Sequence, residues 1–145
     1  MAHYWQGSVS TAWNNADNWV TASGGSTKQS AAPSTGDAVI FNSATMAGPC
    51  DFTLAHGTTI LSLEVQDGLS ANTLVNTAGS KTLTIKTTMT ISEHSVFSFG
   101  NTFTFIFDGS GTQLTVFDGA GSSSGVATTH IKLDLNSGES MFDGA

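Results

Sequence analysis

Lys81-Thr82-Leu83-Thr84-Ile85-Lys86 is the stretch that decides the fold class. Its apolar residues alternate with threonine and lysine, and successive side chains of a β-strand point to opposite faces. The alternation therefore predicts a strand with one buried face. The same parity recurs further along the chain. We expect one shared core from Leu83, Ile85, Phe97, Phe99, Phe103, Phe105 and Phe107.

Short runs of this kind fill the chain from residue 38 onward. β-Branched residues are frequent, strong helix formers are sparse, and no window of eleven residues has helical periodicity. Many short strands joined by glycine-rich turns indicate an all-β domain. The predicted strands are residues 38–41, 51–55, 62–66, 73–76, 81–86, 88–91, 96–99, 103–107, 113–117, 131–135 and 140–142.

A small motif marks the ends of several predicted strands. Phe-Asp-Gly occurs at residues 107–109, 117–119 and 142–144, at irregular spacing. A β-solenoid, or β-helix-like stack of short strands with turns of variable length, would produce this pattern. An antiparallel β-sandwich or jelly roll with Asp-Gly hairpins would produce it too. The repeated motif and the many Ser and Thr turn positions favour the solenoid.

Residues 1–35 differ in composition from the β domain expected over residues 36–145. Three tryptophans, Trp5, Trp13 and Trp19, lie among Asn, Ser, Thr and Gly, which favour turns. We interpret this loop-rich segment as an aromatic cap over an open end of the β domain, since an uncovered terminal strand exposes core and unpaired backbone. Docking to another protein and sugar stacking are the alternatives, because Trp is prominent in both kinds of contact. The candidate docking residues are Tyr4, Trp5, Trp13 and Trp19.

Composition excludes several partners. The chain has 145 residues, of which 39% are hydrophobic and only 10% charged, and its net charge is −7. Typical soluble proteins have about 25% charged residues. Four scattered lysines without any arginine argue against nucleic acid, whose binding depends on phosphate neutralisation. No run of 18 apolar residues is present, so no membrane span is expected.

No motif for catalysis, a metal or a cofactor stands out. The histidines His3, His56, His94 and His130 lack ligand-like spacing, and we interpret them as surface or turn residues. Cys50 is expected to be a small buried hydrophobe. The acidic residues of the Phe-Asp-Gly motifs fit turn formation better than calcium binding, because no Asp-x-Asp-x-Asp loop occurs. We therefore expect no catalytic residue, no metal and no cofactor.

The opening of the chain resembles that of many bacteriophage structural proteins. The similarity rests on Tyr4-Trp5-x-Gly7, on the block from Ser10 to Asn18-Trp19, and on Pro33-x-x-Gly36-Asp37-x-Val39-Ile40-Phe41. It extends over residues 4–55, and similar blocks open units of secreted bacterial β-solenoids. The resemblance implies a non-enzymatic virion protein and supplies no catalytic residues.

Small size and an all-β chain then favour a capsid decoration or cement protein, built as a homotrimer that binds the major capsid protein or another virion protein. Residues 1–7 contain no signal-peptide pattern, which fits assembly in the host cytoplasm and residence in the virion. The alternative is an extracellular glycan- or receptor-binding module of a head or tail fibre or of a bacterial adhesin.

Overall fold

The computed structural model describes residues 1–46, 51–66, 75–76, 81–91, 103–107, 113–116 and 130–132. This part of the chain is rich in strands and contains a single short 3-10 helix, η1 (Ala16–Asn18), which confirms the all-β class. The strands are β1 (Ala2–Trp5), β2 (Trp19–Val20), β3 (Ala38–Phe41), β4 (Asp51–Phe52), β5 (Thr58–Ile60), β6 (Ser62–Val65), β7 (Val75–Asn76), β8 (Lys81–Ile85), β9 (Thr88–Ile91), β10 (Phe103–Phe107), β11 (Gln113–Val116) and β12 (His130–Lys132).

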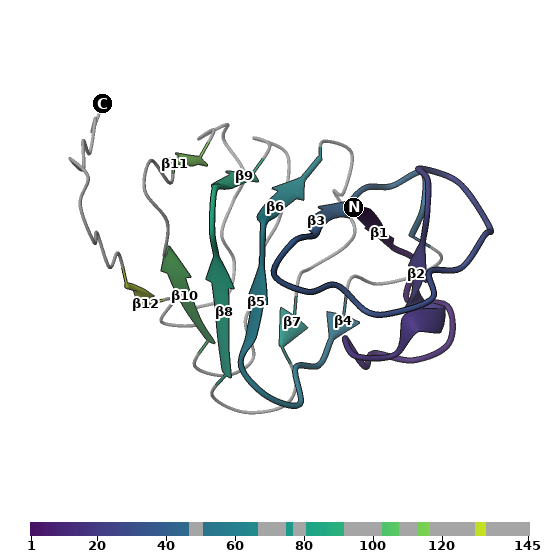
Figure 1. Cartoon of the computed structure of the whole chain (residues 1–145), viewed down its shortest axis with the longest axis horizontal. Coiled ribbons are helices and arrows are strands. Elements are labelled where there is room, and N and C mark those ends of the chain that lie inside the picture. Colours follow the sequence, from purple (N-terminus) through teal and green to yellow (C-terminus); the bar gives the residue numbers. More distant parts are fainter. Residues whose placement is uncertain are drawn as a thin grey trace.

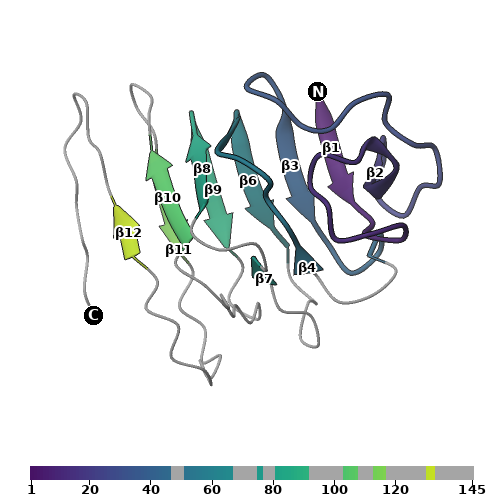
Figure 2. The same ribbon diagram turned by 90° about the horizontal axis from the view of Figure 1, so that it is seen from below.

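The strands form three sheets that the chain visits in turn. The largest sheet has the order β11-β9-β6-β3-β1-β2, the second has the order β12-β10-β8-β5, and β4 and β7 form the third. Strands that are far apart in sequence therefore lie side by side, and they progress from β2 and β1 at one end to β11 and β12 at the other (Figures 1 and 2).

Parallel pairing distinguishes this arrangement from a sandwich. Among the described strand pairs only β1 and β2 run antiparallel. The antiparallel sandwich or jelly roll left open by the sequence does not fit this pairing. An Asp-Gly hairpin between residues 103–107 and 113–117 is not formed either, because β10 and β11 belong to different sheets.

The pairing register shows a repeat length that the sequence motifs concealed. Ala38 of β3 pairs with Ser62 of β6, an offset of 24 residues. Leu63 pairs with Met89, an offset of 26, and Leu114 lies opposite Met89, an offset of 25. The first step is longer, since Ala2 pairs with Ala38 over 36 residues. The extra length of this step contains η1, β2 and the loop that follows.

Register and parity together build the core. Val39, Leu63 and Met89 occupy one row across β3, β6 and β9, and all three are buried. Leu83 and Ile85 of β8 are buried while Thr84 between them is half-buried, as the alternation predicts. Phe97 and Phe99 lie outside the described residues, and so do the side chains of Phe103, Phe105 and Phe107, so their expected place in the core stays a prediction.

Residues 1–35 do not have a core of their own. Their three tryptophans belong to the same buried cluster as Phe41, Phe52 and Leu83. β1 pairs in parallel with β3, and β2 adds antiparallel to the outer edge of β1. The compositional boundary near residue 35 is therefore crossed by both the sheet and the core.

Candidate functional site

The aromatic residues singled out in the sequence converge at the N-terminal end of the largest sheet. Trp5 is on β1, Trp19 is on β2, and Trp13 lies between them, beside η1. Their exposed fractions are 0%, 0% and 2%. Tyr4 has the opposite parity on β1 and is half-buried. The three indoles thus present almost no surface to a partner, and of the four candidate docking residues only Tyr4 is not buried.

Half of the ring contacts are edge to face, and the others are tilted or stacked. Trp19 meets Trp5 and Trp13 at centroid distances of 4.8 Å with interplanar angles of 71° and 74°. Phe52 contacts Trp13 at 5.2 Å, and Phe41 contacts Phe52 at 5.9 Å. Such arrangements match the quadrupoles of aromatic rings and add stability beyond the buried area. We call Trp5, Trp13, Trp19, Phe41 and Phe52 the aromatic cluster.

The indole nitrogens are satisfied unequally. Trp19 Nε1 donates to the Trp13 carbonyl at 2.8 Å. Trp5 Nε1 and Trp13 Nε1 are buried without a hydrogen-bond partner in the described structure. Gly7 lies directly against the Trp5 ring, because a Cβ placed on it would be 2.8 Å from Nε1. Gly7 also has φ +60°, which glycine adopts at little cost. These two constraints explain the spacing Trp5-x-Gly7.

Asn18 organises the loop between β1 and β2. Its side chain is fully buried and makes four hydrogen bonds. Oδ1 accepts from the amides of Val9 (3.2 Å) and Ser10 (3.0 Å), while Nδ2 donates to the Ala12 carbonyl (2.8 Å) and to Ser10 Oγ (3.0 Å). A buried amide that satisfies both of its ends fixes the local backbone.

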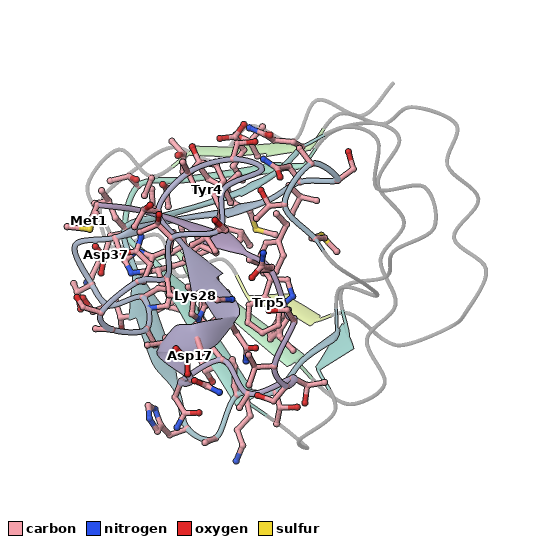
Figure 3. The ribbon with its side chains drawn as sticks, turned by 90° about the vertical axis from the view of Figure 1, so that its right-hand side faces the viewer. Met1, Tyr4, Trp5, Asp17, Lys28 and Asp37 are labelled. Atoms are coloured by element: carbon pink, nitrogen blue, oxygen red, sulfur yellow. The ribbon has the colours of Figure 1, made fainter. Side chains whose placement is uncertain are left out.

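Lys28 ties three parts of the N-terminal segment together. Its ammonium donates to the Gln6 side-chain oxygen, to Ser8 Oγ at 3.1 Å and to the Asp17 carbonyl at 2.7 Å. Figure 3 shows Lys28 close to Asp17 on this side of the molecule. The three acceptors match the three donors of an ammonium group. Lys28 therefore has a structural role here.

A second polar group lies at the start of β1. His3 is buried, and its Nε2 is 3.2 Å from the Ala31 carbonyl. Its Nδ1 is 3.8 Å from Asp37 Oδ1, which the terminal ammonium of Met1 also contacts at 3.0 Å. Met1 and Asp37 are neighbours in Figure 3. Burial lowers the pKa of His3, and the opposing effects of Asp37 and the Ala31 carbonyl do not outweigh it.

The same carboxylate closes a turn. Asp37 Oδ2 accepts from the amide of Ser34 at 3.0 Å and from its hydroxyl at 2.9 Å. Partial burial raises the pKa of Asp37, but the hydrogen bonds from the Met1 ammonium and Ser34 outweigh it and lower the pKa overall. Asp37 is therefore a charged anchor that joins the chain start to the entry of β3.

The remaining candidate residues do not gather into a reactive site in the described structure. His56 is exposed, and its Nδ1 is 2.9 Å from the Gly57 carbonyl of its own turn. Cys50 and His94 lie outside the described residues, and so do Asp108, Asp118, Asp143 and the side chain of His130. Within the described ranges no three His, Cys, Asp or Glu side chains are placed to share a metal ion. The same ranges contain no helix of the length and apolarity needed to span a membrane.

Exposed apolar side chains are few on the part of the surface that is described. Met1, Val9 and Leu61 are exposed by 78%, 58% and 37%. Ile40, the partner of Tyr4 across β1 and β3, is half-buried. Tyr4 and Ile40 therefore form a short apolar strip on the outer face of the largest sheet.

Sequence reasoning did not find the roles of Asn18 and Lys28, and its interpretation of His3 as a surface or turn residue is wrong, because His3 is buried within β1. Asn18 and Lys28 act through loops whose course depends on the packed core. His3 had a usable signal, since the alternation Ala2-His3-Tyr4-Trp5 gives it the parity of a buried tryptophan. Comparisons with protein families, with curated proteins and with solved structures find no match to this chain.

Proposed function

We propose that this protein is a non-enzymatic structural component of a bacteriophage virion, a capsid decoration or cement protein. The observation that carries the proposal is the way the phage-like motif is used. Trp5, Trp13 and Trp19 of that motif contact one another and Phe41, its last residue, within a single buried cluster. The aromatic residues of the motif are thus used in packing within the shared core, which supports the interpretation of the motif as structural.

The architecture that we propose is a short β-solenoid closed at its N-terminal end by residues 1–35. Beyond the first step, parallel pairing at offsets of 22 to 26 residues supports it, because a chain that winds once per turn of the solenoid pairs each strand with the equivalent strand of the next turn. The antiparallel strand β2, on the outer edge of β1, fits the role of a cap. A covered terminal strand limits edge-to-edge association.

Docking to the capsid is assigned to the outer surface and not to the indoles. Tyr4 and Ile40, which are neighbours on the outer face of the largest sheet, supply apolar contact area. A homotrimer would present three copies of this surface to the major capsid protein, and linked copies gain affinity through effective concentration. The protein would assemble in the host cytoplasm and reside in the virion.

The glycan- or receptor-binding alternative relied on contacts made by Trp5, Trp13 and Trp19, and burial of these three indoles argues against such contacts. Sugar stacking needs an accessible ring face, and these rings are at most 2% exposed. An extracellular binding module would have to use other residues, and no observation on the described surface favours one.

The direct test is mass spectrometry of purified virions from the source phage, with the copy number per particle. The purified protein is also mixed with undecorated heads at low and high salt. We expect saturable binding that survives high salt, because so few charges are available to steer it. Tyr4→Ser should weaken binding, whereas Thr84→Ser, on a different sheet, should not. Absence from virions, or release by moderate salt, would contradict the proposal.

A further inference from the structure

We propose that His3 is an acid-sensitive latch: the neutral imidazole holds residues 29–37 against β1, and protonation of this ring releases them. This inference is independent of the proposed function. It rests on where the register places His3, on the partners of its two nitrogens, and on the anchoring of the segment that lies over it.

In the row of paired residues that crosses the largest sheet, β1 contributes the titratable ring of His3, whereas the strands beside it contribute apolar side chains. His3 pairs with Val39, which pairs with Leu63, which pairs with Met89. His3 is 4% exposed, and its ring meets the edge of Trp19 at 6.1 Å. An imidazolium at such a position would lose most of its hydration, and burial of a charge is costly unless the charge is well paired.

The two ring nitrogens define the neutral state. Because its partner is a carbonyl, Nε2 must carry the proton that it donates to Ala31. Nδ1 is then an unprotonated acceptor, and it is buried without a hydrogen-bond partner. A proton taken up by the ring would therefore be located on Nδ1.

The charged groups that face Nδ1 offer it little compensation. From the described segments packed against the ring these are the Asp37 carboxylate and the Met1 ammonium, whereas β2 contributes the neutral ring of Trp19. Asp37 Oδ1 is 3.8 Å from Nδ1 but only 3.0 Å from the ammonium. Its other oxygen already accepts two hydrogen bonds from Ser34. Burial therefore prevails, and the pKa of His3 in the folded state is lowered.

The segment over His3 is attached to the rest of the molecule mainly at its two ends. At its C-terminal end the Met1 ammonium donates to the Gly36 carbonyl at 3.1 Å, and the Leu61 amide donates to the Asp37 carbonyl at 2.9 Å. Gln29 donates its backbone amide to the Trp19 carbonyl at 2.9 Å and its side-chain Nε2 to the Ala2 carbonyl at 2.7 Å. Pro33 is buried, whereas Ser30, Ala31, Ser34, Thr35 and Gly36 are exposed. Opening residues 29–36 would break the Met1–Gly36 hydrogen bond and hydrate the His3 ring, while the pairing of β3 with β6 and the Leu61–Asp37 hydrogen bond beside it could remain.

Linkage fixes the sign and the window of the effect. The open state takes up a proton as the pH falls through about 6.5, while the closed state does so only at a lower pH. The closed state therefore loses stability as the pH falls from 6.5 toward the lowered pKa of His3. Asp37 acts in a different window, because its lowered pKa gives stability that is lost only below about pH 3.8.

The experiment is hydrogen exchange of the full chain at pH 7 and pH 5, corrected for intrinsic rates. The informative amides are those of Gln29 and Asp37, and the reference amides are those of Lys86 and Thr87, bonded to the carbonyls of Ile60 and Leu61. We expect the protection of the Gln29 and Asp37 amides to be lower at pH 5 than at pH 7. The decrease should be at most about tenfold for each pH unit that separates the pKa of His3 from 6.5. The reference pair should change less.

Two variants and one direct measurement complete the test. His3→Gln keeps a donor for the Ala31 carbonyl but does not titrate, so its protection should be the same at both pH values. His56→Gln, at an exposed histidine, should behave like the unmodified protein. An NMR titration of His3 in the unmodified chain covers the case in which His3→Gln fails to fold. A pKa of 6.5 or above, or an unchanged pH response in His3→Gln, would overturn the proposal.

Discussion

Gly7 shows how one small residue can be required by both backbone and packing. Its φ of +60° and the indole of Trp5 leave no room for a side chain. Gly7→Ala should lower the free energy of unfolding by about 1–3 kcal/mol, the usual cost of a strained backbone position. Urea denaturation measures this effect. Gly36→Ala is the matched control, because a Cβ there meets no atom within 4 Å, and equal losses in both variants would contradict the assignment.

Asn18 is the residue on which the loop between β1 and β2 depends. Asn18→Ala would leave the amides of Val9 and Ser10 and the Ala12 carbonyl without this partner. Since each such group costs about 1–3 kcal/mol when it is buried and unsatisfied, and these are partly buried, we expect a loss of about 2–4 kcal/mol. Asn14→Ala, at an exposed position nearby, should have little effect in the same thermal or urea melts. Similar losses of unfolding free energy in Asn18→Ala and Asn14→Ala would contradict the conclusion that Asn18 holds this loop.

Within the strand β8, alternation should translate directly into stability. Leu83 is fully buried and Thr84 is half-buried. Leu83→Ala should cost about 2–5 kcal/mol, because it leaves a cavity in the core. Thr84→Ala should cost about 0.5 kcal/mol or less. Urea midpoints of the two variants make the comparison, and equal shifts would mean that the register is wrong.

The elements that could be predicted are those whose signal is local. The runs that contain β3, β6, β8, β9, β10 and β11 alternate or are strongly apolar, so their existence followed from the sequence. β5 (Thr58–Ile60) was missed because two of its three residues are threonines without alternation. β1 and β2 were missed because they are short, and their strand character depends on pairing with each other and with β3. Parallel pairing depends on contacts between distant residues, which no local pattern contains.

The candidate site was only partly accessible to the same reasoning. The density of tryptophans in residues 1–35 pointed to Trp5, Trp13 and Trp19, but not to Phe41 and Phe52, which belong to the same cluster. It could not establish burial, because an exposed docking patch and a buried cluster have the same composition. Burial was decided by parity on β1, where Trp5 faces inward and Tyr4 outward, and by the loop held by Asn18.

At the scale of the molecule, the N-terminal segment should be inseparable from folding. Removing residues 1–20 would delete β1, β2 and all three buried tryptophans, and would uncover the edge of β3. We therefore expect the truncated chain to lose stability and to self-associate, since uncovered strand edges pair with other chains. Light scattering and circular dichroism would detect both effects. A monomeric truncation with native secondary structure would instead restore residues 1–20 as a separable docking arm.

The long interval between the first paired strands, from Ala2 on β1 to Ala38 on β3, also has a consequence for folding during translation. The end of the strand series that contains β1 and β2 is built from residues early in the chain, with Thr53 bonded back to Thr11 and Trp13. These residues are synthesised before β6, β8 or β10. The strands β6, β8, β9, β10, β11 and β12 are each synthesised after the strand with which they pair, which lies 22 to 26 residues earlier in the chain. During translation each of these strands would thus find its partner strand already synthesised, and only the short segment between the two strands would have to close into a loop.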